Sequence, residues 1–213
     1  NVTSANQNDL PAISYVDGKI KFHTRSNTSD PTSYSSAKAL FDAKDDSNNR
    51  YGCSHPNTYA GIRNSTQNPP NGASVDFIAY STATFTVPSS GQWGVRYGAD
   101  YGLGGGLYVD GIAWDERWDE DLWWNNSWTN PAVLSGIRTL SAGEHKLEII
   151  GAEGGNDGGL TIQFYSGATG TWEQDATNIG ITIKSEACPV VRHTIQYGSH
   201  ETCNVDLSIE APV

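Results

Sequence analysis

The sequence contains no methionine, and charged residues make up only 17% of its 213 positions. No apolar run approaches the roughly 18 residues that a membrane-spanning helix needs, so we expect no insertion into a membrane. No zinc-ligand spacing, P-loop, G-x-S-x-G or H-E-x-x-H motif occurs. We therefore expect a protein without enzymatic activity. Because the chain begins at Asn1, we also expect a processed chain or a fragment of a longer one.

Basic residues are scarce, with 13 lysines and arginines against 24 aspartates and glutamates, which gives a net charge of −11. A surface this negative repels phosphate backbones, so nucleic acid is excluded as a partner. The charge is compatible with neutral sugars, with cationic partners or with calcium bound by clustered carboxylates. The alternative explanation is that the charge serves only solubility.

Glycine, tryptophan and tyrosine are abundant, and apolar runs from position 75 onwards recur about every 8–12 residues, which is typical of a sandwich or barrel. We predict an all-β protein, an antiparallel, jelly-roll-like β-sandwich. One short helix is expected over residues 37–44, with Ser35 or Ser36 as its N-cap, and a long loop over 50–74. The predicted domain spans 1–185, with its core at about 75–167, and 186–213 forms a C-terminal β-extension or hairpin.

Three cysteines occur, and no two of them form a CxxC motif. In an extracellular protein, Cys188 and Cys203 are expected to close a local loop, with Cys53 left free or paired between chains. Pairing of Cys53 with either of the other two stays open, because sequence alone does not fix the connectivity.

Residues 83–165 contain four short segments, which follow one another in this order: Thr84-Phe85-Thr86-Val87-Pro88, Leu107-Tyr108-Val109-Asp110-Gly111, Leu140-Ser141-Ala142-Gly143-Glu144-His145 and Leu160-Thr161-Ile162-Gln163-Phe164. This stretch resembles the second half of the protective-antigen-type and GLEYA group of β-sandwich domains. It is also similar to secreted proteins with a Cys-Cys-x-Gly motif. The resemblance implies a β-sandwich, and the group includes calcium-dependent sugar-binding adhesins as well as modules of glycosidases and toxins.

In the sugar-binding members of that group, two adjacent aspartates shortly before the Leu107–Gly111 segment hold calcium. In this chain the positions that correspond to the two aspartates lie near Gly102 and Leu103, and the nearest acidic residue is Asp100. The resemblance therefore implies either a displaced calcium site, with Asp100 and the glycine-rich loop around Gly104 and Gly105, or a missing one.

Five of the seven tryptophans lie between positions 114 and 128, interspersed with five acidic residues. Sugars stack their C–H faces on flat aromatic rings while carboxylates and amides accept or donate to their hydroxyls. We expect ligand-binding side chains at Trp123, Trp124, Asn125, Asn126 and Trp128. The alternative is that the tryptophans cover one end of the sandwich and the acids face water.

The loop from Glu153 to Gly159 offers oxygen ligands from Glu153, Asn156 and Asp157. Calcium takes about six to eight oxygens, often from carboxylates and backbone carbonyls together. With Asp100, these residues form a candidate metal site, and the alternative is an ordinary hairpin turn.

These patterns favour an extracellular or cell-surface recognition domain that binds glycans or a cell-surface polymer, with calcium as its cofactor. The rival hypothesis is a structural subunit of an extracellular filament or coat. In that case a terminal strand would add to the sheet of a neighbouring subunit.

Overall fold

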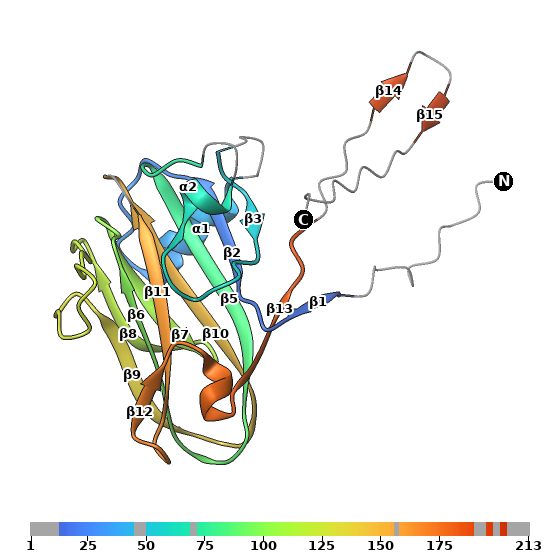
Figure 1. The fold of residues 1–213 in the computed structure, drawn as a ribbon. Helices are drawn as coiled ribbons and strands as arrows, with labels where there is room; N and C mark the ends of the chain where they lie inside the picture. Colours follow the sequence, from blue (N-terminus) through green and yellow to red (C-terminus); the bar gives the residue numbers. More distant parts are fainter. Residues whose placement is uncertain are drawn as a thin grey trace.

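The computed structural model describes residues 13–44, 50–68, 72–155, 158–189, 195–197 and 201–203, and for the last two ranges only the backbone. Two antiparallel sheets pack face to face and form an all-β sandwich (Figure 1), which confirms the predicted fold class. In the described part of the chain, no helix is long and apolar enough to cross a membrane.

Sheet A has eight strands in the described residues, with β5, β10 and β7 at its centre. Its strands are β1 (Tyr15–Asp17), β2 (Lys21–Ser26), β3 (Cys53–Ser54), β5 (Phe77–Val87), β7 (Gly104–Val109), β8 (Ile112–Trp118), β10 (Gly143–Glu153) and β13 (Thr182–Glu186). β5 pairs with β10 over its whole length, from Val87–Gly143 to Phe77–Glu153. Its other edge is shared by β2 and β13.

Sheet B has five described strands, in the order β12-β11-β6-β9 with β4 beside β11. They are β4 (Ile62–Arg63), β6 (Gly91–Ala99), β9 (Leu134–Leu140), β11 (Gly159–Ser166) and β12 (Thr171–Glu173). A separate hairpin joins β14 (Ile195–Tyr197) to β15 (Glu201–Cys203). This hairpin lies inside the C-terminal extension expected over 186–213.

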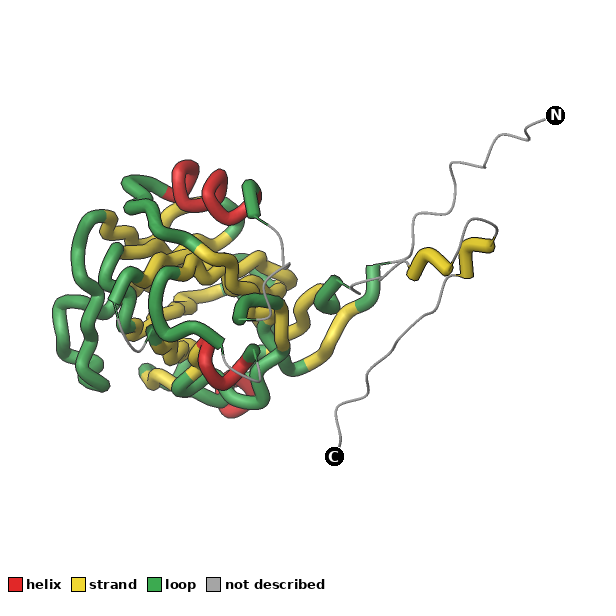
Figure 2. The backbone as a smooth tube through the Cα atoms, turned by 90° about the horizontal axis from the view of Figure 1, so that it is seen from above, coloured by secondary structure: helices red, strands yellow, loops and turns green. Residues whose placement is uncertain are grey.

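The inner faces of the two sheets form the main core, because alternate residues of each strand point inward. On β6, Val95 and Tyr97 are fully buried, and on β11 Ile162 and Phe164 lie opposite them in register. A smaller core lies on the outer face of sheet A, where Ala37 and Phe41 of the helix α1 (Tyr34–Asp42) are buried. Figure 2 shows α1 lying across the strands.

The helix α1 begins three residues earlier than the sequence predicts. Ser33 is its N-cap, in a reciprocal capping box with Ser36, so the hydroxyl expected to cap the helix lies inside its first turn. The segment 50–74 is less irregular than expected, since it contains β3, β4 and the short helix α2 (Asn64–Gln67). A 3-10 turn, η1 (Ala176–Ile179), precedes β13.

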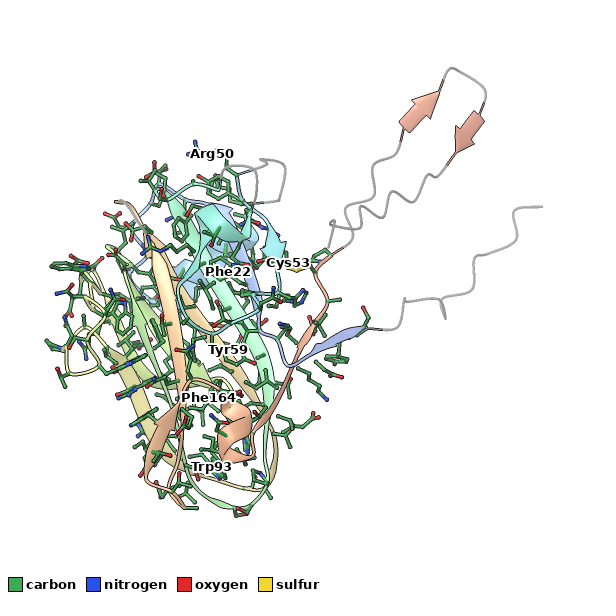
Figure 3. All side chains as sticks on the ribbon, viewed as in Figure 1. Phe22, Arg50, Cys53, Tyr59, Trp93 and Phe164 are labelled. Atoms are coloured by element: carbon green, nitrogen blue, oxygen red, sulfur yellow. A yellow bond between two sulfur atoms is a disulfide. The ribbon has the colours of Figure 1, made fainter. Side chains whose placement is uncertain are left out.

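The disulfide joins Cys53 to Cys188, with the two Cα atoms 5.5 Å apart, so the predicted Cys188–Cys203 bond is wrong. The reason is the long-range course of the chain. β3 lies beside β2 on sheet A, and the chain leaving β13 passes alongside it, which brings Cys188 to Cys53 across 135 positions (Figure 3).

Candidate functional site

Three loops meet at one end of the sandwich, which we call the loop end: residues 99–103, 119–133 and 153–159. The amide of Asp100 donates to the carbonyl of Gly159 at 2.9 Å. The amides of Leu122 and Trp124 donate to the carbonyls of Tyr101 and Ala99, both at 3.1 Å. Backbone hydrogen bonds therefore fix all three loops against the end of β6.

Glu153 is the buried acidic residue of the loop end, with 2% of its surface exposed. Its carboxylate accepts from the amide of Gly102 at 3.0 Å and from the amide of Gly155. Burial raises the pKa of the Glu153 carboxyl to about 7, the two amides oppose the rise, and the nearby carboxylates of Asp100 and Asp121 add to it. Glu153 therefore ties two loops together and concentrates negative charge beneath them.

A recess of about 320 Å³ opens beside Glu153. Gly102, Gly154 and Gly155 form one wall, and Asp30 and Asp76 form another. Ligand sites combine such concave surfaces with a few convergent polar groups.

Trp123 is the exposed aromatic of the loop end, with 57% of its surface accessible. It pairs with Ala99 through an isolated bridge, which places it next to Asp100 along the backbone. Its amide donates to Oδ1 of Asp121 at 3.0 Å, so Asp121 fixes the turn that presents the indole. The backbone of Trp123 therefore lies beside the end of β6, and Asp100 and Asp121 are both close enough to Glu153 to raise the pKa of its carboxyl further above the effect of burial.

Trp124 and Trp128 occupy a different environment from Trp123, because they pack on the outer face of sheet B. Trp124 is 9% exposed and covers Gly98, where an added Cβ would lie 2.2 Å from its ring. Its ring centroid lies 4.7 Å from that of Trp128, and the guanidinium of Arg96 lies 4.3 Å from the Trp128 centroid on the other side.

The stack continues beyond Arg96, whose guanidinium also lies 4.4 Å from the ring of Trp172. Gln163 on β11 accepts from Nε of Arg96 at 2.9 Å and holds the guanidinium in place. We call Trp124, Trp128, Arg96 and Trp172 the ladder. The planes of Trp124 and Trp128 are tilted by 53° to each other, and the guanidinium of Arg96 lies over the rings of Trp128 and Trp172, so the ladder fastens the 119–133 loop to sheet B.

The remaining expected ligand residues are divided between loop and sheet. Asn125 and Asn126 are exposed and adopt left-handed backbone angles, with φ of 52° and 53°. Gly104 and Gly105 are buried at the start of β7, where added Cβ atoms would meet backbone oxygens of Arg117 and Ile150. The expected glycine-rich loop is therefore shorter than the sequence suggests, since residues 104–106 belong to a strand.

The loop end offers hard oxygen donors of the kind that calcium prefers. Both oxygens of Glu153 accept amide hydrogen bonds, whereas Asp100 and Asp121 provide further carboxylates close by. Asn156 and Asp157 lie outside the described residues. Among the described side chains, no group of three or more His, Cys, Asp or Glu is arranged to hold a metal ion.

Sequence reasoning missed three residues that shape the loop end: Asp121, Arg96 and Trp172. The acidic run 119–121 marked the neighbourhood of Asp121 but did not distinguish it. Arg96 alternates with the buried Val95 and Tyr97 on β6, which predicts that it points outward. Its stacking partners come from other parts of the chain, so no local pattern could have identified them.

No family model matches the chain, and no curated protein matches it. Among solved structures, the PA14 domain of the antifreeze protein MpAFP is similar, with a TM-score of 0.57 and 15% identity over 84% of this chain and 96% of that one. A PA14 sugar-binding domain from an RTX adhesin gives a TM-score of 0.48 and 15% identity, covering 73% of this chain and 93% of that one. The first likeness shows the sandwich fold of PA14 domains. The narrower protective-antigen-type or GLEYA grouping stays a prediction.

Proposed function

We propose that the protein is a non-catalytic extracellular recognition domain that binds glycans at the loop end with the help of calcium. The observation that carries the proposal is the exposed indole of Trp123, whose backbone bridges to Ala99 and whose amide donates to Asp121. A disulfide between Cys53 and Cys188 supports an extracellular location, because such bonds persist in oxidising compartments.

In this proposal, Trp123 supplies the contact area and the acidic residues supply the polar specificity. The C–H face of a sugar ring stacks on the indole, and its hydroxyls bind carboxylate oxygens or the ion. Calcium would be held by carboxylates that include Asp100 and Asp121, and it would offset their charge, which adds to the effect of burial in raising the pKa of Glu153.

A glycan array tests the proposal, using the protein with calcium, with chelator and as the variants Trp123→Ala and Asp100→Asn. We expect saturable binding that W123A and chelator both abolish. Tyr15→Ala is the matched control, because Tyr15 is also an exposed aromatic, 50% accessible, but lies on β1. Binding that is equal in W123A and the wild type would contradict the proposal.

The filament alternative is supported by β1, an edge strand of only three residues that pairs with β13. Ile13 and Tyr15 near this edge are 64% and 50% exposed. An unpaired strand edge with apolar side chains accepts a strand from another chain. Size measurements over a range of concentrations separate the two proposals: a monomer at every concentration contradicts the filament.

A further inference from the structure

A second concave surface lies away from the loop end, around the turn between β1 and β2. Two recesses of about 270 Å³ and 510 Å³ both include Gly18, Thr177 and Ile183 in their walls. Because these three residues line both recesses, the recesses adjoin, and an added Cβ at Gly18 would meet nothing within 4 Å. We call the joined recesses the Gly18 groove. Figure 1 shows η1 beside β12 and β13, away from the loop between β8 and β9.

The floor of the Gly18 groove is apolar and rigid. Ile181 and Ile183 are 1% and 7% exposed. The ring of Tyr59 packs edge-to-face on Phe164 with 6.0 Å between centroids, and its hydroxyl donates to the carbonyl of Gly18 at 2.8 Å. Tyr59 is thus held by both ends, as Figure 3 indicates by its position near Phe164.

The rim of the groove carries amides and hydroxyls beside its charged side chains. Lys19 donates to Oδ1 of Asn57 at 2.9 Å, which leaves the NH₂ group of Asn57 as a donor. Asp175 uses Oδ1 to accept from both the amide and the hydroxyl of Thr177, which fixes the η1 side of the rim. Gln174 completes this side. The rim groups are therefore placed before any ligand arrives.

The charges of the groove disfavour anionic ligands. Its walls include the carboxylates of Asp17, Glu144 and Asp175. Against them stand Lys184, which already forms an ion pair with Glu144, and Lys19, which reaches the rim at Asn57. A phosphate or carboxylate would meet net negative charge. A hydrocarbon chain would leave the polar rim without partners, which is costly for desolvated groups.

We propose that the Gly18 groove is a second ligand site, which binds a neutral oligosaccharide. An apolar floor for C–H faces and a rim of amides, hydroxyls and carboxylates for sugar hydroxyls is the composition such a ligand needs. The larger recess, of about 510 Å³, lies by itself in the range of small-ligand pockets. This site uses neither Trp123 nor calcium, so it goes beyond the proposed function of the loop end.

Amide chemical shifts of the full chain, titrated with cellobiose, maltose and lactose in the presence of chelator, test this proposal. We expect at least one disaccharide to shift the amides of residues 57–59 and 174–177, and the same shifts in Trp123→Ala. Thr58→Trp, which fills the first recess, should weaken binding about tenfold or more. Thr139→Trp on the exposed part of β9 is the matched control and should leave binding unchanged.

The outcomes separate this proposal from the loop-end proposal. Shifts confined to residues 99–103 and 121–126, or no shifts with any of the three sugars, would overturn the groove as a neutral-sugar site. An unchanged dissociation constant for the groove shifts in T58W would overturn it as well. Groove shifts that survive W123A and chelator, together with glycan-array binding that W123A leaves unchanged, would support the groove and contradict the proposed function of the loop end.

Discussion

The outer faces of the two sheets are covered in different ways. On sheet A, α1 buries Ala37 and Phe41 against Ile78 and Ile150, so a second apolar core forms. On sheet B, the 119–133 loop is fastened by the ladder, in which rings and one guanidinium stack. The helix covers its face by burying aliphatic and aromatic surface, whereas the loop is held by stacking at a few points.

The two ways of covering a sheet lead to different expectations for substitutions on each face. A helix packed on a sheet gains most of its stabilisation from burial of its apolar face, so its buried side chains tolerate few substitutions. The 119–133 loop is held by backbone hydrogen bonds, by the buried Leu122 and by the ladder, and Trp123 between these anchors faces solvent. We therefore expect substitutions under α1 to lower stability and substitutions at the exposed part of the loop to alter binding.

The largest effect is expected from Phe41→Ala. Phe41 is 6% exposed and contacts the rings of His23 and Tyr80, with centroids 5.0 Å and 5.4 Å away. Loss of a buried phenyl ring should lower the free energy of unfolding by about 3 kcal/mol, measured by urea denaturation. Ala39→Ser, exposed on the same helix, should change it little. A small effect of F41A would mean that α1 contributes little to the fold.

Gly98→Ala should displace Trp124 from its place in the ladder. The new methyl group would lie 2.2 Å from the ring of Trp124, so the indole must move, at a cost of about 1–3 kcal/mol. Near-ultraviolet circular dichroism should show the loss of the Trp124–Trp128 stack. Gly91→Ala is the matched control on the same strand, since its Cβ would lie 3.9 Å from the nearest atom. Equal stability of G98A and G91A would contradict the packing described.

Glu148 on the helix-covered face should give an acid dependence of stability. Its carboxylate is 4% exposed; burial raises its pKa, but hydrogen bonds from Tyr80, Lys146 and Tyr34 outweigh this and lower the pKa below 4.5. A carboxyl whose pKa is lower in the folded than in the unfolded state stabilises the fold at every pH above its unfolded-state pKa. This contribution is lost as the pH falls through the folded-state pKa. Glu148→Gln should cost about 1–2 kcal/mol at pH 7 and flatten the stability curve below pH 4.5. The same loss of stability at acid pH in Glu148→Gln and in the wild type would contradict this role.

Arg96→Ala should lower stability by about 1 kcal/mol, because two ring–guanidinium contacts are lost. Arg96→Lys should recover little of it, since an ammonium lacks the flat face and the geometry of the bond to Gln163. Limited proteolysis within 119–133 should speed up in both variants. Full recovery in R96K would show that charge, not stacking, holds the loop.

Trp123→Ala should have the smallest effect on stability, within about 0.5 kcal/mol, because its side chain is mostly exposed. A thermal melt measures this directly. A larger loss would place Trp123 in the packing of the loop and weaken its assignment to ligand binding.

The strands of the sandwich could be predicted from the sequence because their apolar alternation is local. The runs at Lys146–Ile150 and Leu160–Phe164 fall inside β10 and β11. The Cys53–Cys188 bond could not be predicted, because it depends on β3 and the end of β13 meeting across the sheet edge. The prediction of a C-terminal extension over 186–213 rests only on a change in the character of the sequence.

The candidate site was only partly predictable from the sequence. The cluster of tryptophans and acids pointed to the 119–133 loop, but only the three-dimensional arrangement separates the exposed Trp123 from Trp124 and Trp128, whose rings pack on each other. That separation depends on Gly98 and Arg96, which are distant in sequence from the loop. That Gly104 and Gly105 belong to strand β7 could not be predicted either, because the residues they pair with lie on β8 and β10.

The most direct test of the account is the calcium dependence of glycan binding and of the melting temperature, for the wild type and Asp100→Asn. Calcium should be set at about 10⁻³ M, enough to fill a weak extracellular site. We predict that calcium raises the melting temperature of the wild type and permits binding on the glycan array, and that D100N loses both effects while Asp42→Asn on the exposed end of α1 keeps them. Identical melting and binding with calcium and with chelator would contradict a calcium-dependent site at the loop end.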